Sequence, residues 1–445
     1  MSENPPPTQQ GRRGVPLHTK IFVGLALGLV AGLAANALAH DSAWLAFVVE
    51  NVAQPLGQVF LRMLFMVVVP LVFTSITLGV AGLSDAERIG RIGGKALLIF
   101  VITTALAVVV GLAVVNVLRP GEALDPQVQA ALLAEYASDA AARGSAAGKF
   151  GVQTFVDIIP RNPIDSAARG DMLGIIFFSL VFGFALTRLP ERQSKPVLQF
   201  LEGLGDAVTV MIGFAMKLAP IGVAALIFAV TSRFGLDILR SLGLFVVTVL
   251  GALAIHQFGI NSLLVRFLGG MSPVGFFRRI RAPMLTAFST SSSNATLPTT
   301  IRTAQDELGV PKEIAGFVLP LGATMNMNGT ALFEGLTVLF LAQVFGVELS
   351  VGSQIVVVVM AVITAIGVAG VPGGSIPLLV MVLEMVGVPG EGIALILGVD
   401  RILDMCRTTS NVTGDLVASL LITRSENLAP AAVPAAVEVA EPTER

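Results

Sequence analysis

Charged side chains are scarce in this chain of 445 residues, at 13% of the sequence. Soluble proteins carry about 25%. Cysteine occurs once, as Cys406, which excludes a scaffold of disulfide bonds. The 28 basic and 30 acidic residues leave no surplus positive charge for binding nucleic acid. Hydrophobic residues reach 54% and the mean hydropathy is +0.83, so polar groups could not cover a soluble fold. These features predict a protein that crosses a membrane several times.

The apolar part of the chain divides into long stretches. They lie at 21–40, 47–83, 96–118, 172–187, 196–230, 241–268, 312–345, 353–388 and 391–423. Several exceed the roughly 20 residues that a straight crossing needs, which predicts tilted or broken helices. The first stretch fits an uncleaved span better than a signal peptide, which would have a shorter apolar core.

Lysine and arginine residues indicate which loops face the cytoplasm. Runs of them lie before the first apolar stretch and at 88–95, 188–195 and 278–281. We therefore expect a multi-pass protein of the cell (inner) membrane with both termini in the cytoplasm. Residues 1–14 and 426–445 have the composition of disordered tails.

Gly24, Gly28 and Gly32 form a row of small residues in the first apolar stretch. Such a row lets two helix backbones approach closely. It indicates close helix packing within the chain, with a dimer seam as the alternative.

Polar residues inside membrane spans are costly, so they are candidates for function. They cluster at 289–298, at 322–331 followed by Glu334, at 367–377, and at 400–415. The first cluster fits the tip of a re-entrant hairpin or a polar cytoplasmic loop. The second interrupts an apolar helix, freeing carbonyls for a hard cation, and the third separates two arms too short to cross. The motifs Asn326-Met-Asn-Gly329 and Asn411-Val-Thr-Gly414 echo one another, as expected of inverted repeats.

The fourth cluster forms one face of a helix. Its members are Asp400, Asp404, Arg407, Asn411 and Asp415. Their spacings of 4, 3, 4 and 4 residues place them within an arc of about 80°. Apolar residues flank the cluster on both sides, which argues against a solvated surface stripe. Arg401 points away from this face.

Other signals do not support an enzyme. Three matches to a glycosylation sequon, at Asn294, Asn328 and Asn411, lie inside the polar clusters and are chance matches. The histidines His18, His40 and His256 are too dispersed for a metal cluster. Cys406 has no histidine nearby in sequence and fits helix packing.

Four motifs in order carry a resemblance to a known family. They are Ser-Ser-Ser-Asn-Ala-Thr-Leu-Pro, Asn-Met-Asn-Gly-Thr-Ala-Leu, Ala-Gly-Val-Pro-Gly-Gly and Asp-Met-Cys-Arg-Thr-Thr-Ser-Asn-Val-Thr-Gly-Asp. Over about 15–425 the chain resembles the glutamate transporter family of dicarboxylate/amino acid:cation symporters. The resemblance implies an all-α polytopic membrane protein with eight transmembrane helices, two re-entrant helical hairpins and inverted repeats. It also implies a homotrimer in which a transport domain slides past a scaffold, an elevator motion.

The resemblance also implies a division of the chain into scaffold and transport parts. The scaffold would comprise 15–83 and 119–230, the latter with an extracellular loop. The transport domain would comprise 84–118 and 236–425. Within its core we expect hairpin 1 at about 271–303, helix 7 at 312–345, hairpin 2 at 353–388 and helix 8 at 391–423.

Substrate ligands carry over from the family one position at a time. Arg407 matches the ligand of a side-chain carboxylate, a role that suits its planar fork, and Asp404 matches the acceptor of an amino group. Further matches are Ser292, Ser293, Thr330, Val371, Gly373, Thr408 and Asn411. Neutral amino acid carriers lack the arginine and dicarboxylate carriers lack the carboxylate at Asp404. The pair therefore predicts uptake of L-aspartate or L-glutamate.

The family also implies sodium as the coupling ion, with no other cofactor. One site would use Gly322, Asn326, Asn411 and Asp415. A second would use carbonyls near Thr324 and at Ala365, Ile366 and Val368. Thr103 and Thr104 match hydroxyls of a third site, which is weakened because Asn328 stands where many members have aspartate.

Two further positions differ among family members. Glu334 matches the proton-carrying members, and a buried carboxyl can be held in its protonated form. It is therefore our candidate for proton coupling. Ser291 stands where some prokaryotic members carry arginine, and Arg401 can supply that charge from the helix.

Two alternatives to sodium-coupled uptake of acidic amino acids stay open. A proton-coupled C4-dicarboxylate carrier belongs to the same family. A passive anion channel also uses buried arginine and hydroxyls. Accumulation against a gradient separates a carrier from a channel.

Overall fold

The computed structural model describes residues 17–39, 42–81, 90–124, 159–169, 172–235, 237–367, 370 and 373–426. Helices and no strands form in these ranges. The first half contains α1 (Leu17–Ala39), α2 (Ala43–Val48), η1 (Val49–Ala53), α3 (Gln54–Phe65), α4 (Val68–Ala81), α5 (Gly90–Leu118), η3 (Pro120–Ala123), α8 (Pro163–Arg169), α9 (Met172–Thr187) and α10 (Glu191–Phe234). The second half contains α11 (Asp237–Ala254), η4 (Ile255–Ile260), α12 (Asn261–Phe267), α13 (Pro273–Arg279), α14 (Arg281–Thr290), α15 (Ser293–Asp306), α16 (Lys312–Met325), α17 (Asn328–Val344), α18 (Val351–Gly367), α19 (Ile376–Met385), η5 (Gly390–Leu395) and α20 (Leu397–Ser425). The expected tails 1–14 and 427–445, and most of the loop after η3, lie outside the described residues.

Six helical segments of the described chain are long and apolar enough to cross a membrane. They are Thr19–Ala39, Ala43–Ala81, Arg91–Ala123, Glu191–Arg233, Leu239–Phe267 and Lys312–Val344. The α9 helix is apolar but has 16 residues, and α20 has 29 residues but carries buried charges. The chain is therefore a multi-pass membrane protein in which several helices depart from a simple apolar span.

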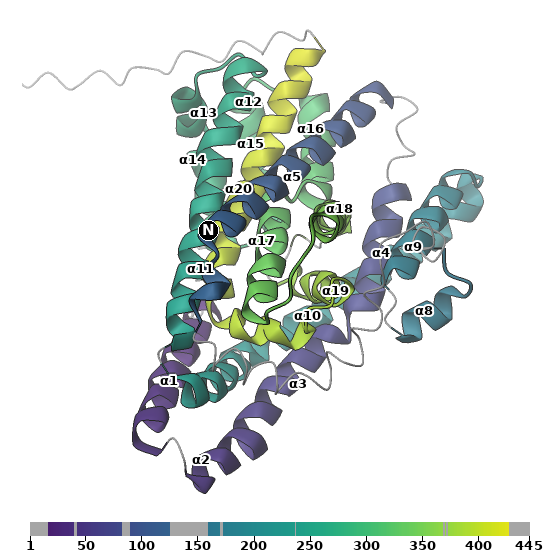
Figure 1. Ribbon diagram of the computed structural model, residues 1–445. Helices are drawn as coiled ribbons and strands as arrows, with labels where there is room; N and C mark the ends of the chain where they lie inside the picture. The colour runs from purple at the N-terminus through teal and green to yellow at the C-terminus, as the bar shows by residue number, and fades with distance from the viewer. Residues whose placement is uncertain are drawn as a thin grey trace, which may run out of the picture.

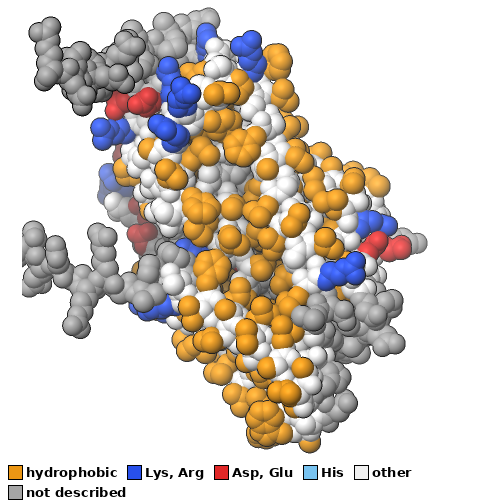
Figure 2. Space-filling model, turned by 90° about the vertical axis from the view of Figure 1, so that its left-hand side faces the viewer, with side chains coloured by type: hydrophobic (Ala, Val, Ile, Leu, Met, Phe, Trp, Pro, Cys, Tyr) orange, Lys and Arg blue, Asp and Glu red, His pale blue; other side chains and the backbone are white. Residues whose placement is uncertain are grey.

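The outer surface is apolar where a lipid environment requires it. Leu27, Val30, Phe200, Val247 and Phe267 are among the large hydrophobic side chains that are mostly exposed. Figure 2 shows hydrophobic side chains spread over the middle of one face, with many lysines and arginines near its upper end. Lipid tails cover such side chains without the cost that water would impose.

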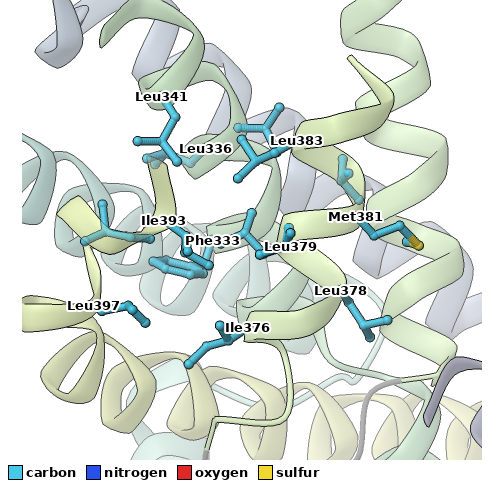
Figure 3. Packing of buried hydrophobic residues seen from close by; sticks show 14 of the residues in the cluster. Phe333, Leu336, Leu341, Ile376, Leu378, Leu379, Met381, Leu383, Ile393 and Leu397 are labelled. Carbon is cyan, nitrogen blue, oxygen red and sulfur yellow. The ribbon is translucent and has the colours of Figure 1, made fainter. Parts of the chain in front are cut away.

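The α16–α17 segment lies at the centre of the helices. In its membrane-length window 94% of the residues are buried, far more than in the other five windows. Figure 1 shows α17 next to α18, α19 and α20. Phe333, Leu336 and Leu341 of α17 pack with residues of α19 and η5 in one apolar cluster (Figure 3). Side chains on α17 therefore face protein and not lipid.

Three interruptions divide the helices that surround this centre. The α14 helix ends at Ser291, whose backbone is left-handed with φ of 50°, and α15 begins two residues later. The α16 and α17 helices separate at Asn326 and Met327, which leave helical geometry. Residues 368–375 separate α18 from α19. The breaks fall in the first three polar clusters of the sequence. The α20 helix, in contrast, runs unbroken through Asn411–Gly414. The motifs at 326–329 and 411–414 are therefore similar in sequence but differ in backbone geometry.

The glycine row of α1 packs against α10. A Cβ atom added at Gly24 would collide with the Pro220 carbonyl oxygen, and one at Gly28 with the Ala224 carbonyl oxygen. A Cβ atom added at Gly32 would likewise collide with the Thr231 hydroxyl oxygen. The prediction of close helix packing within the chain is therefore confirmed.

This contact predicts opposite effects for two glycine-to-alanine substitutions. Gly28→Ala overpacks the α1–α10 contact, a change that costs about 1–3 kcal/mol, and should lower the melting temperature in detergent. Gly251→Ala in α11 is the matched control, because no atom lies within 4 Å of its added Cβ. Removing glycine from an open helix position stabilises by about 0.5–1 kcal/mol, so its melting temperature should stay or rise. A melting temperature for Gly28→Ala that is no lower than that of the wild type would contradict this packing.

Candidate functional site

The break between α16 and α17 is held by a side chain from α20. The Asn411 amide oxygen accepts hydrogen bonds from the backbone N–H groups of Gly329, at 2.8 Å, and Thr330, at 3.2 Å. Its amide nitrogen donates to the Thr330 hydroxyl at 3.0 Å. The first N–H groups of a helix have no partner within the helix, so Asn411 acts as an N-cap supplied by another helix.

A second link joins the end of α16 to α20. The Asn326 amide nitrogen donates to Asp415 Oδ1 at 2.9 Å, and Thr103 Oγ1 of α5 lies 3.4 Å from Asn326 Oδ1. A Cβ atom at Gly322 would lie 2.5 Å from Asp415 Oδ1, so only glycine allows this approach. The carboxylate, the amide oxygen and the end of α16 thus meet in one buried place with oxygen ligands suited to a hard cation.

Asn328 lies beside this group. Thr104 Oγ1 donates to Asn328 Oδ1 at 2.7 Å. The Asn328 amide nitrogen has no hydrogen-bond partner among the described residues, although it packs against Gly414. The hydroxyls of Thr103 and Thr104 therefore both reach the helix break.

Arg407 is fully buried and pairs with two carboxylates of its own helix. Its Nη1 donates to Asp400 Oδ1 at 2.8 Å, and its Nε donates to Asp404 Oδ1 at 3.1 Å. The guanidinium lies 4.2 Å from the centre of the Phe333 ring. Nη2 is also 3.1 Å from Asp404 Oδ1, but at an angle that gives no hydrogen bond within the described residues. The guanidinium is thus fixed in orientation and keeps donor capacity at Nη2.

Asp404 stands between two guanidinium groups and a backbone N–H. Its Oδ2 lies 3.6 Å from Arg401 Nη1 and accepts from the Gly373 N–H at 3.4 Å. The expectation that Arg401 points away from the charged face is therefore wrong, because its long side chain reaches back to Asp404 one turn along α20. Gly373 has φ of 77°, a conformation that favours glycine, and faces Met216 of α10. Arg401, Arg407, Asp400 and Asp404 are all buried, and their formal charges sum to zero.

The tips of the two helix pairs touch each other. Ser292 Oγ donates to the Gly370 carbonyl oxygen at 2.6 Å, and the Asn294 N–H donates to the same oxygen at 3.4 Å. Ser292 also caps α15 by accepting from the Ala295 N–H. Ser293, the first residue of α15, is buried, as is Ser291, whose hydroxyl has no partner among the described residues. The α14–α15 turn therefore closes against the segment between α18 and α19.

Glu334 is buried on α17 and meets α18. Its Oε2 lies 2.8 Å from Thr364 Oγ1, and its Oε1 has no partner among the described residues. The Thr364 hydroxyl is also within hydrogen-bond distance of the Met360 carbonyl oxygen, at 2.9 Å. A hydroxyl has one proton, so a protonated Glu334 can donate to Thr364 while Thr364 donates to Met360.

The remaining predicted site residues have mixed placements. Thr408 is buried on α20, and Ala365 is buried near the end of α18, with Ile366 half-buried beside it. The Thr324 side chain is exposed and donates to the Leu321 carbonyl oxygen. Val368 and Val371 lie outside the described residues.

A cavity of about 700 Å³ adjoins the touching tips. Its wall includes Ser75, Asp206, Asn294, Thr324, Ile366 and Gly370. These residues come from α4 and α10 on one side and from α15, α16, the end of α18 and the segment after it on the other. The tips and the Thr324 side chain are thus reached from a common space between two groups of helices.

The sequence did not reveal the contact partners of some candidate residues. Asp400 was on the predicted charged face, but its direct pairing with Arg407 follows from the seven-residue spacing, which is two helical turns. Thr364 has no signal in sequence, because its partner Glu334 is 30 residues away on another helix. His256, set aside with the other histidines as a metal ligand, contacts Ser410 of α20, and its neighbour Gln257, which the sequence did not single out, contacts Thr413.

The chain matches the model of the "Sodium:dicarboxylate symporter family" over residues 17–425. It is 38% identical over 413 residues to the "Proton/sodium-glutamate symport protein" of Bacillus subtilis (strain 168), covering 93% of each chain. It is 34% identical to the "Proton/glutamate-aspartate symporter" of Escherichia coli (strain K12), covering 92% of this chain and 93% of that one. A "C4-dicarboxylate transport protein" of Bacillus subtilis is 34% identical, over 84% of this chain and 87% of its own. The broken α16–α17 segment, the touching tips and the charged face of α20 all lie within the matched range, and the chain belongs to the sodium:dicarboxylate symporter family.

Proposed function

We propose that this protein takes up an acidic amino acid, L-aspartate or L-glutamate, by symport with sodium. The observation that carries the proposal is the buried pair of Arg407 and Asp404 beside the α16–α17 break. A guanidinium recognises a carboxylate, and a carboxylate recognises an ammonium. Relatives named for glutamate symport support the same substrate class.

The substrate would bind between α20 and the two tips. Arg407 Nη2 would donate to the side-chain carboxylate, and Asp404 would accept from the amino group. The other ligands would be Ser292, Ser293, Thr330, Val371, Gly373, Thr408 and Asn411. Asn411 already donates a hydrogen bond to the Thr330 hydroxyl, so a substrate bound to Asn411 would also affect the geometry of the break between α16 and α17.

Sodium would bind where the broken helix meets α20. Asp415 supplies the carboxylate, Asn326 and Asn411 supply amide oxygens, and Gly322 supplies a carbonyl oxygen near the end of α16. The hairpin carbonyls at Ala365, Ile366 and Val368, with one near Thr324, would form a second site. Asn328 with Thr103 and Thr104 would form a weaker third site, because an amide attracts sodium less than a carboxylate.

Glu334 would carry a proton. A buried carboxylate without a cationic partner is costly, and protonation removes that cost. Glu334 contacts Thr364 of α18, so its protonation state bears on how α18 packs against α17. Relatives named as proton symporters support this assignment.

The membrane arrangement follows the family expectation. We propose eight transmembrane helices and two re-entrant hairpins, formed by α14–α15 and α18–α19, in inverted repeats. The scaffold at 15–83 and 119–230 would form a homotrimer, past which the transport part at 84–118 and 236–425 moves as an elevator. The protein would lie in the cell (inner) membrane with both termini in the cytoplasm.

A C4-dicarboxylate carrier is the second candidate, favoured by relatives with that name. A dicarboxylate has no amino group that could donate to Asp404. The buried carboxylate next to Arg407 therefore favours an amino acid over a dicarboxylate, and accumulation against a gradient would separate either carrier from an anion channel.

The proposed carboxylate ligand is tested by Arg407→Cys. Uptake of radiolabelled aspartate into proteoliposomes with an inward sodium gradient should fall about 100-fold or more, since paired charge-assisted hydrogen bonds are lost. Arg302→Gln is the control, because Arg302 is exposed and pairs with Asp306. Unchanged uptake by Arg407→Cys, or wild-type uptake indifferent to sodium, would overturn the proposal.

The selectivity role of Asp404 is tested by Asp404→Asn. The preference for aspartate over succinate, measured by competition, should fall about 10–100-fold, because a hydrogen bond to a charged group is worth about 1.5–3 kcal/mol. Asp306→Asn is the matched control at an exposed position. A preference that survives Asp404→Asn would place amino-group recognition elsewhere.

The proton role of Glu334 is tested by Glu334→Gln. Gln cannot take up a proton, so the part of aspartate uptake that depends on an inward proton gradient should disappear, while exchange of internal for external aspartate in sodium continues. Glu313→Gln, at an exposed position of α16, serves as the control. Wild-type uptake that ignores a pH gradient would remove proton coupling altogether.

A further inference from the structure

A π-helical turn, η4, carries polar side chains into the interior on the side of α20 away from the proposed substrate site. His256 and Gln257 lie in η4, and Asn261 follows it as the first residue of α12. Relative exposure is 0% for His256 and Asn261 and 6% for Gln257. A π-turn inserts an extra residue in a helix and often marks a functional position.

Two contacts join this turn to α20. His256 Nδ1 lies 3.3 Å from Ser410 Oγ, and Gln257 Nε2 donates to Thr413 Oγ1 at 2.8 Å. Ser410 and Thr413 are one helical turn apart, so η4 lies along one side of α20. Val265, one turn after Asn261 in α12, joins the apolar cluster that contains Val412 and Leu416 of α20.

Four polar atoms of these side chains have no partner in the part of the chain that the structure describes. They are His256 Nε2, Gln257 Oε1, Asn261 Nδ2 and Asn261 Oδ1. A buried polar group without a hydrogen bond is destabilising, and a helix inside a membrane has no bulk water beside it. In the fully buried Asn261 side chain, both polar atoms would lack a hydrogen bond.

The mixture of hydrogen-bond donors and acceptors at these atoms indicates which ligand could bind them. Gln257 and Asn261 each present a carbonyl oxygen, Asn261 also presents an N–H donor, and His256 presents one ring nitrogen. None is a carboxylate, so a metal ion would lack charge compensation, and the two oxygens would repel an anion. A water molecule donates two hydrogen bonds and accepts two, which suits this mixture.

We propose that His256, Gln257 and Asn261 form a binding site for ordered water, which we name the η4 polar site, and that this site positions α20. The α20 segment between Ser410 and Gly414 lies between η4, which contacts Ser410 and Thr413, and the start of α17. A Cβ at Gly329 would lie 2.8 Å from Ser410 Cβ, and one at Gly414 would lie 2.6 Å from Asn328 Nδ2. A shift of α20 towards α12 would therefore move Asn411 away from the N-terminus of α17.

Radiolytic footprinting of the purified full chain tests the water directly. Hydroxyl radicals formed from bound water label adjacent side chains even when these are buried. His256 should be labelled about 10-fold faster than Phe245, which is equally buried inside an apolar cluster and serves as the dry reference. Labelling of His256 as slow as that of Phe245 would overturn the water site. This readout needs no transport, so its failure leaves the proposed function untouched.

The positioning role, which rests on the proposed function, is tested by Asn261→Leu and Asn261→Ser. Leucine fills the volume of asparagine but forms no hydrogen bonds, so the rate at which His256 is labelled should fall severalfold. The apparent KM for aspartate should rise about 5-fold, and the maximum rate of uptake should fall by a smaller factor. Serine keeps a donor and an acceptor and should restore both values in part. Unchanged KM in a folded Asn261→Leu protein, or no difference between the two variants, would overturn the positioning role. If Asn261→Leu does not fold, Gln257→Leu provides the same comparison.

Discussion

Burial of the Arg407 guanidinium is the constraint on which the centre of this protein depends. An unpaired charge at membrane depth is costly, and a lone partner leaves most of the five N–H donors unsatisfied. The α20 helix solves both problems within itself, since Asp400 and Asp404 lie two turns and one turn before Arg407. Such a helix cannot face lipid. The surrounding helices must enclose its charged face, and α17, which is buried along nearly its whole length, is one of the helices that contact it.

The same helix also stabilises the break between α16 and α17. Leaving helical geometry at Asn326 and Met327 frees the first N–H groups of α17 inside the protein, away from bulk water. Asn411 accepts from two of them, and Asp415 accepts from the Asn326 amide. The positive end of the α17 dipole therefore points toward α20. Binding at this place and the geometry of the break depend on one another, because the same two side chains serve both.

Much of this centre could be predicted from sequence, and the rest depends on contacts between distant segments. The charged face of α20 follows from spacings of three and four residues, and the broken segment from Asn326 and Gly329 within an apolar run. Membrane class followed from composition. The Glu334–Thr364 contact could not be predicted, since it joins two helices whose packing has no local signal. The η4 turn was missed because a π-turn adds one residue to a helix without a distinctive composition.

Asp404 imposes an order on substrate exchange under the proposed function. It already contacts Arg407, Arg401 and the Gly373 N–H, so it is compensated before any ammonium arrives. An incoming amino group would compete with these contacts for the carboxylate oxygens. The Gly373 contact is the longest of the hydrogen bonds and belongs to the segment between α18 and α19, whereas Arg401 and Arg407 are fixed to α20 itself. The Gly373 contact is therefore the one most readily exchanged, and its loss would free that segment from α20. Recognition of the amino group and movement of the α18–α19 pair would then be a single event at one carboxylate.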